Sequence, residues 1–404
     1  MLSHNEMGNK DNEIKSELKR IEVLQEMIKI SGLSGGLLFY SRDVFYYTGT
    51  AQPSYFFVLP QSYFLFVRAG SDFALREAQI EREKIKEERQ LEDIFKEIFP
   101  LITGGGKIGT ELDVLPANRL SEFSRIFTGF EIVDISPLIL NQRKRKEASE
   151  IKAIREACNT IHRGHERALS VLKEGMTELE LAAAVEDAHR LAGHEGTFFI
   201  RQPDFFMSRG PLASGPNLYQ ISGLVYSITG IGLGASVPIG PSRRKIEKGD
   251  LVIVDIPVLV EGYHADQTRT YTVGKAKDET KKLFKSLKEI ADYLIQYITP
   301  GMRCSDIYKM ALKKAEELQV GKHFLNFGGG RRSRIIGHGV GLELNEPPIL
   351  SNYDDSHITD GLVLALDMHM MDEKSGVVKL EDMILIGENK NELLTVTPRD
   401  LFEV

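Results

Sequence analysis

The first third of the chain mixes helical and strand-like patterns of apolar residues. Residues 13–30 place apolar side chains at helical spacing, and a glycine-containing stretch at 31–36 ends that pattern. Short apolar runs typical of strands follow, at residues 36–40, 44–47, 55–59, 63–67, 107–109 and 131–134. Because these strands are interspersed with helical segments, the pattern predicts an α/β N-terminal domain with a mixed or parallel sheet.

A dense charge run at 141–147 separates this region from a second pattern. A long amphipathic helix begins at Ala148, and Thr177 with Glu180 predicts a capping box at the start of another helix. Two more helices are expected at 281–298 and 305–318, and the rest is rich in glycine and short strands. The chain is therefore expected to hold a domain at 1–143 and an α+β domain at 144–404, with helices outside a curved, mostly antiparallel sheet.

Composition narrows the class of protein. The 404 residues include 51 Lys+Arg and 58 Asp+Glu, a formal net charge of -7, which argues against a dedicated nucleic-acid binder. The two cysteines exclude a disulfide framework and favour a cytoplasmic location. The N-terminus lacks the apolar core of a signal peptide, and the apolar stretch 55–67 is too short to span a bilayer. We therefore expect no nucleic-acid partner and no membrane partner.

An aspartate interrupts the apolar strand at 251–258. If a hairpin turns at 260–262, Asp255 lies opposite Asp266, with Cβ atoms about 5 Å apart. Two carboxylates so placed repel each other unless one is protonated or a cation lies between them. The sequence thus predicts a cation at this acid pair.

A second hairpin repeats the arrangement. Across a turn at 372–376, Asp367 lies opposite Glu381, and His338 stands between glycines in the segment that separates the two hairpins. Four carboxylates and one imidazole suit a hydrolytic site with two divalent cations about 3.5–4 Å apart, and Mn, Co, Zn and Fe ions all fit these donors. A single strand aspartate is more often a turn cap or an ion-pair partner, and a single histidine beside glycines is more often a hydrogen-bonded loop residue. The two matched hairpins together favour the metal site.

In this order the residues resemble the pita-bread metallopeptidase family, which includes aminopeptidase P, prolidase, methionine aminopeptidase and creatinase. The shared motifs are Asp255, Gly262-Tyr263, Asp266 with Thr268-Arg269-Thr270, 337–341, 345–348 and Glu381-Asp382, and residues 20–50 are similar to a creatinase-type N-terminal domain. The resemblance implies a pita-bread C-terminal domain, a small peptide or small-molecule substrate, a homodimer, and metal ligands Asp255, Asp266, His338, Asp367 and Glu381. It also implies a metal-dependent hydrolase that acts on Xaa-Pro peptides through attack of water on an amide carbonyl.

Three departures from the family pattern concern catalysis. Asp367 stands where the family has a glutamate, Asn345 stands where the peptidases have a histidine, and the stretch 235–241 lacks a second expected histidine. His264 and His369 lie two residues from Asp266 and Asp367, so they share a strand face with them and are candidate acid/base groups or extra ligands. The alternative is that both line the rim of the pocket.

Further candidates come from the neighbouring segments. Glu346 is the candidate proton acceptor, Asn345 a substrate contact, and Arg332 a cation that captures a substrate carboxylate. For Arg332 a solvated loop that pairs with acidic residues is the competing interpretation. Two other functions stay open: a non-peptidase reaction on the same fold, such as C–N hydrolysis or a lyase elimination, and a homologue without catalysis.

Overall fold

The computed structural model describes residues 4–102, 105–202, 205, 208–223 and 227–404. The chain divides into two compact units, 1–142 and 143–404, which are described separately. Within the described residues, no helix is both long enough and apolar enough to cross a membrane.

A six-stranded mixed sheet forms the centre of the first unit. Its order is β4-β3-β2-β1-β5-β6, with antiparallel pairs β1–β2 and β2–β3 and parallel pairs β3–β4, β1–β5 and β5–β6. The elements are α1 (His4–Ile30), β1 (Gly35–Leu38), α2 (Ser41–Thr48), β2 (Ser54–Leu59), β3 (Ser62–Val67), α3 (Ser71–Glu77), β4 (Ile85–Glu87), α4 (Leu91–Ile98), β5 (Gly106–Thr110), α5 (Ala117–Ile126), β6 (Phe130–Asp134) and α6 (Ser136–Lys144). The expected mixed α/β architecture is confirmed.

One expected strand is wrong. Residues 44–47 lie in the helix α2, where Val44, Tyr46 and Tyr47 are all buried. The helix ends at Gly49, whose φ of 76° is the left-handed conformation that favours glycine. A run of four apolar residues does not distinguish a buried strand from a buried helical turn.

The second unit is built around a nine-stranded sheet. Its main path is β13-β12-β14-β15-β11-β8-β7, antiparallel throughout, while β16 pairs with β15 and β17 with β11. The strands are β7 (Leu212–Ser214), β8 (Leu251–Asp255), β11 (Thr268–Thr272), β12 (Ile335–Gly339), β13 (Glu346–Ser351), β14 (Val363–Asp372), β15 (Gly376–Leu385), β16 (Glu392–Leu393) and β17 (Phe402–Glu403). A short hairpin of β9 (Val258–Val260) and β10 (Tyr263–Ala265) stands beside it.

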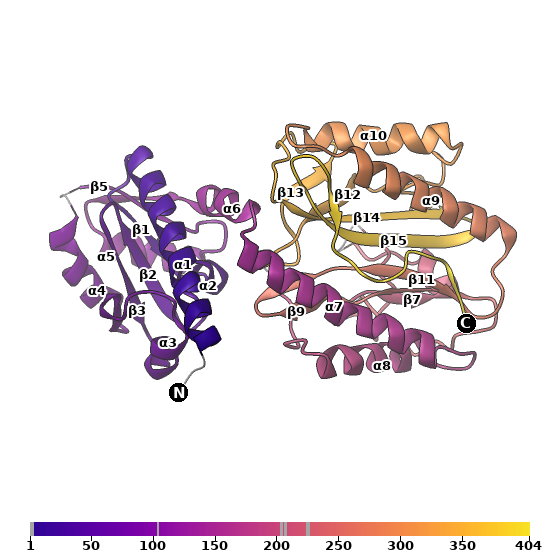
Figure 1. Ribbon diagram of the computed structural model, residues 1–404, viewed down its shortest axis with the longest axis horizontal. Coiled ribbons are helices and arrows are strands. Elements are labelled where there is room, and N and C mark those ends of the chain that lie inside the picture. Colours follow the sequence, from indigo (N-terminus) through magenta and orange to yellow (C-terminus); the bar gives the residue numbers. More distant parts are fainter. Residues whose placement is uncertain (1–3, 103–104, 203–204, 206–207, 224–226) are drawn as a thin grey trace. The chain divides into compact units, whose positions relative to one another are not determined.

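Four helices cover one face of this sheet. They are α7 (Ala148–Val171), α8 (Glu178–Leu191), α9 (Asp278–Tyr297) and α10 (Cys304–Glu317), and Figure 1 shows α9 and α10 beside β14 and β15, with α7 and α8 toward β7 and β11. Leu364, Leu366 and Met368 of β14 pack into the core with α9 and α10. Because side chains alternate along a strand, Asp367 and the residues two positions to either side of it point to the opposite face, away from the helices.

The predicted capping box at α8 is present. Thr177 Oγ1 accepts a hydrogen bond from the Glu180 amide at 3.1 Å, and Glu180 Oε2 accepts one from the Thr177 amide at 2.8 Å.

We expect Thr177→Ala to lower the free energy of unfolding by about 1 kcal/mol, since an amide at the start of the helix loses its acceptor. Urea unfolding measures this change, and Thr177→Ser, which keeps the acceptor, is the control. Equal destabilisation by both substitutions would contradict the capping role.

Candidate metal centre

Strand register brings the acidic residues to one face of the large sheet. Thr268 of β11 lies opposite Asp255 of β8 and also opposite Glu381 of β15. Asp367 of β14 lies directly opposite Glu381, which confirms the expected acid pair of the second hairpin. His338 of β12 lies opposite Ala365, two residues before Asp367. Residues two apart on a strand share a face, so the imidazole and these carboxylates face the same side.

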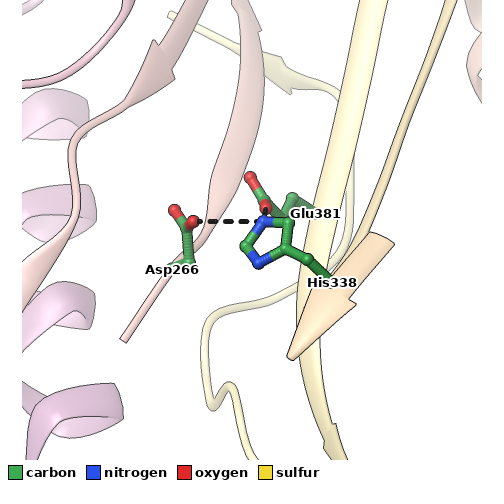
Figure 2. Close-up of side chains that lie close together, drawn as sticks. All are labelled: Asp266, His338 and Glu381. Atoms are coloured by element: carbon green, nitrogen blue, oxygen red, sulfur yellow. Dashed lines mark ion pairs between the residues drawn. The ribbon is translucent and has the colours of Figure 1, made fainter. Parts of the chain in front are cut away.

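The expected direct pairing of Asp255 with Asp266 is wrong. The turn is formed by Glu261 and Gly262, whose φ values of 51° and 79° are both left-handed, and Val260 therefore pairs with Tyr263. The same register places Asp255 opposite Thr268. Asp266 lies two residues before Thr268, just ahead of β11, and its carboxylate faces His338 (Figure 2).

Asp266, His338 and Glu381 form a compact donor set. Their ligand atoms all lie within 4.8 Å of one another, and all three residues are buried. His338 Nε2 is 3.8 Å from Asp266 Oδ2 and 3.9 Å from Glu381 Oε1, as Figure 2 shows. These separations are too long for hydrogen bonds but shorter than the sum of two metal–ligand bonds of about 2.0–2.2 Å. The three residues therefore fit a divalent cation between them.

The imidazole is oriented as a ligand. His338 Nδ1 lies 3.1 Å from the Gly339 carbonyl oxygen, so Nδ1 carries the proton and donates it, and Nε2 presents its lone pair to the two carboxylates. Burial lowers the pKa of His338, which keeps the ring neutral at neutral pH. A neutral imidazole is the form that binds a metal.

Asp255 and Asp367 have a different partner. Lys379 Nζ lies 2.5 Å from Asp255 Oδ2, 3.1 Å from Asp367 Oδ1 and 3.5 Å from Glu381 Oε2. The contact with Asp367 is an ion pair without hydrogen-bond geometry, because Asp367 Oδ1 has no hydrogen-bond donor among the described residues. Burial opposes the charge on Lys379, but Asp255, Asp367 and Glu381 outweigh it and raise the pKa of Lys379 well above its usual value.

The pKa values of the acids show that negative charge is still in excess. Burial, followed by the charge of Asp255, raises the pKa of Asp266 well above its usual value. Burial and the charge of Asp266 do the same for the pKa of Glu381. Burial also raises the pKa of Asp255, although Lys379 pulls it down. One ammonium is thus not enough to hold Asp255, Asp266 and Glu381 all in their charged form, and a further cation would be stabilised here.

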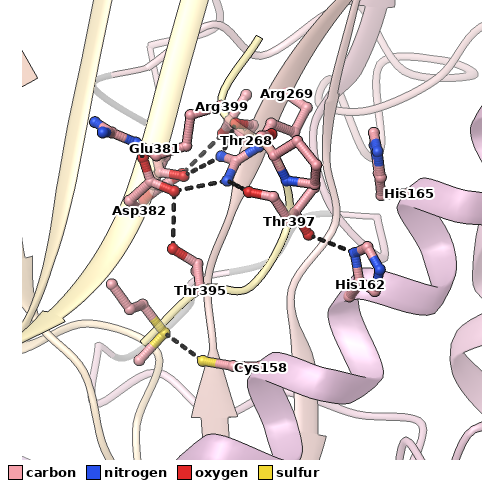
Figure 3. Close-up of polar contacts among 12 residues, drawn as sticks. Cys158, His162, His165, Thr268, Arg269, Glu381, Asp382, Thr395, Thr397 and Arg399 are labelled. Carbon is pink, nitrogen blue, oxygen red and sulfur yellow. Dashed lines mark hydrogen bonds and ion pairs between the residues drawn. The ribbon is translucent and has the colours of Figure 1, made fainter. Parts of the chain in front are cut away.

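Arg269 anchors the strand that carries Glu381. Its guanidinium donates to Asp382 Oδ1 at 2.7 Å, to the Glu381 carbonyl at 2.7 Å and to the carbonyls of Thr268, Thr397 and Pro398 (Figure 3). Thr268 Oγ1 donates to Glu381 Oε2 at 2.8 Å. The backbone and side chain of Glu381 are therefore both fixed before any metal binds.

Both additional histidines are held by backbone groups. His264 Nε2 accepts from the Phe199 amide at 2.9 Å, and its Nδ1 lies 3.0 Å from the Gly341 carbonyl. His369 Nε2 lies 3.1 Å from the Asn326 carbonyl, and its ring stacks on Phe327. Burial lowers the pKa of His369 to about 4, so it is neutral at neutral pH. Their acid/base roles stay predictions.

Glu346 lies in a separate buried ion cluster. Its carboxylate contacts Arg143 and lies 3.0 Å from Lys146 Nζ. Burial raises the pKa of Glu346, but the attraction of Arg143 and Lys146 is stronger and lowers it overall, which makes the carboxylate a weak base. Arg143 also pairs with Glu343.

The two expected substrate contacts are exposed. Asn345 is exposed in the segment before β13, and Arg332 is exposed in the loop before β12, with one guanidinium nitrogen 2.8 Å from the Gly321 carbonyl oxygen. Their roles in binding also stay predictions.

Lys379 is the important residue that the sequence interpretation missed. It stands two residues before Glu381 on β15, so it shares the face of Glu381, and the hairpin register that pairs Asp367 with Glu381 places it opposite His369. The regular register of that hairpin is therefore enough to predict Lys379 on the acidic face.

Two protein families match the chain. Metallopeptidase family M24 matches residues 152–388, and the Creatinase/Prolidase N-terminal domain matches residues 20–145. Among curated proteins, the Xaa-Pro dipeptidases of Pyrococcus furiosus and Pyrococcus horikoshii are 26% and 27% identical over 388 residues. These alignments cover 95% of this chain and 99% and 98% of the two relatives.

Solved structures show the same fold. A Xaa-Pro dipeptidase from Bacillus anthracis superimposes with a TM-score of 0.81 at 24% identity, covering 96% of this chain and 100% of that one. The prolidase of Pyrococcus horikoshii has a TM-score of 0.77 at 26% identity, covering 95% and 99%. The similarity therefore extends over both units.

The anchoring role of Arg269 can be tested through stability. We expect Arg269→Met to lower the free energy of unfolding by about 3 kcal/mol, because buried Asp382 and several buried carbonyls lose their donor. Urea unfolding gives the value. Arg163→Met is the matched control, since Arg163 is exposed on α7 and forms a surface ion pair with Glu166. We expect a change within about 0.5 kcal/mol for the control, and an equally small change for Arg269→Met would contradict the anchoring role.

Proposed function

Since the chain belongs to metallopeptidase family M24, we propose that it is a divalent-metal-dependent Xaa-Pro dipeptidase that hydrolyses the amide bond before proline in small peptides. The resemblance to this family of hydrolases and the two-domain fold expected from the sequence are both confirmed. The observation that carries the proposed activity is the buried set of Asp266, His338 and Glu381, which fits a divalent cation. The curated relatives named Xaa-Pro dipeptidase support the choice of substrate.

The residues of the chain have distinct proposed tasks. Asp266, His338 and Glu381 hold the metal, which when bound lowers the pKa of water and polarises a carbonyl. Thr268 and Arg269 fix Glu381, so the donor set does not have to reorganise on binding. Asp255 and Asp367 complete the acidic surface of the site, with Lys379 between them.

Substrate binding and proton transfer are proposed for residues outside the metal set. Arg332 is exposed and can pair with the carboxylate of a dipeptide, with Asn345 as a neutral contact. His264 and His369 remain candidates for moving protons. Glu346 remains the candidate proton acceptor, although its ion pairs with Arg143 and Lys146 work against that role.

The remaining expectations are also proposals. We propose Mn, Co, Zn or Fe as the metal, since carboxylate oxygens with one imidazole suit all four. A homodimer and a cytoplasmic location are proposed from the resemblance and from the cysteine content. The peptidase names of the relatives do not favour the non-peptidase and non-catalytic alternatives.

Metal removal and a ligand substitution test the proposed function together. We expect Mn-loaded protein to hydrolyse Xaa-Pro dipeptides, and chelation to abolish turnover until Mn²⁺ is restored. Asp266→Asn should lower kcat/KM at least about 100-fold, because a charged ligand is lost. Asp72→Asn is the control, since Asp72 is exposed on α3 in the other unit. A protein without bound metal, or full activity in Asp266→Asn, would refute the proposal.

A further inference from the structure

The carboxylates of the site fall into two groups with different partners. Asp266 and Glu381 face His338, whereas Asp255 and Asp367 face the side chain of Lys379, which also lies 3.5 Å from the other carboxylate oxygen of Glu381. We propose that the Lys379 ammonium takes the place of a second metal ion, so that the chain binds a single divalent ion at Asp266, His338 and Glu381. This inference rests on the proposed function, in that the site must bind a divalent metal, and it replaces the expectation of two ions.

The position of the ammonium supports this inference. Lys379 Nζ is 2.5 Å from Asp255 Oδ2 and 3.1 Å from Asp367 Oδ1, so it contacts both carboxylates that stand outside the set of Asp266, His338 and Glu381. A metal bound to both would need oxygens at about 2.0–2.2 Å and would come into contact with Nζ. Two cations at such a distance repel strongly inside a protein. Lysine and a second ion therefore compete for one place.

The lysine has little freedom to leave that place. Its side chain is 1% exposed. Its backbone is clamped from β11 by Thr270, whose Oγ1 donates to the Lys379 carbonyl at 2.7 Å and lies 3.0 Å from the Lys379 amide. With its backbone fixed, the side chain could turn toward solvent only by breaking its ion pairs with Asp255, Asp367 and Glu381.

Charge balance agrees with one ion. The four carboxylates carry four formal negative charges, and the positive charge of Lys379 reduces this excess to three. One divalent ion reduces this excess to one, while a second would reverse its sign in the absence of a further anion. Among the residues that the structure describes, the set of Asp266, His338 and Glu381 is the only group of three or more histidine, cysteine or acidic residues placed to hold a metal.

A matched pair of substitutions separates the two groups of carboxylates. The full chain is loaded with Mn²⁺, freed of unbound ion and analysed for Mn per chain by elemental analysis. We expect one Mn per chain in the wild type and in Asp255→Asn, and a loss of affinity of at least tenfold in Asp266→Asn. Equal losses in both variants would show that Asp255 is a metal ligand and would overturn the inference.

Removing the Lys379 ammonium should make a second metal-binding site available at Asp255 and Asp367. We expect Lys379→Met to bind two Mn per chain, because Asp255 and Asp367 then lack a cation. Lys374→Met is the control, since Lys374 is exposed in the turn of the same hairpin, and it should still bind one. One Mn in both variants would contradict the role given to Lys379.

Spectroscopy keeps the test independent of how well Lys379→Met folds. The electron paramagnetic resonance spectrum of Mn-loaded wild type should be that of an isolated ion, whereas a spin-coupled pair would overturn the inference. Two Mn per wild-type chain with Xaa-Pro hydrolysis intact would refute the inference and leave the proposed function standing. A wild type that binds no metal would refute the proposed function itself.

Discussion

Mutual repulsion among four carboxylates, three of them buried and one partly buried, is the constraint on which the site depends. Asp255, Asp266, Asp367 and Glu381 gather on the sheet face that the helices leave free, and burial raises the cost of their charge. Such a cluster is stable in its ionised form only with cations among its members. In this chain one cation is part of the covalent structure, the ammonium of Lys379, and the donor set around His338 is suited to another.

The antiparallel sheet meets this constraint through register. The long hairpin of β14 and β15 sets Asp367 opposite Glu381 and carries Lys379 on the same face. On the next strand, Thr268 and Arg269 hold Glu381 by its carboxylate and its carbonyl. The site is therefore held by the strands themselves, which limits how far the carboxylates can separate to relieve their repulsion.

The accuracy of the sequence interpretation depended on the regularity of each element. The pairing of Asp367 with Glu381 was predictable because ten residues pair there without a bulge. The pairing of Asp255 was wrong because a shift of one residue in the centre of the turn moves the partner by two positions, from Asp266 to Thr268. The segment 44–47 was misassigned because its packing depends on distant residues. The hairpin register alone places Lys379 on the face of Glu381, but its ion pairs with Asp255 and Asp367 join three strands and leave no local pattern.

Anomalous diffraction from Mn-soaked crystals tests the account most directly, because it locates each ion rather than counting it. The account predicts one anomalous peak, bounded by Asp266, His338 and Glu381, with the Lys379 side chain still between Asp255 and Asp367. A peak between Asp255 and Asp367, with Lys379 displaced from its position, would contradict it.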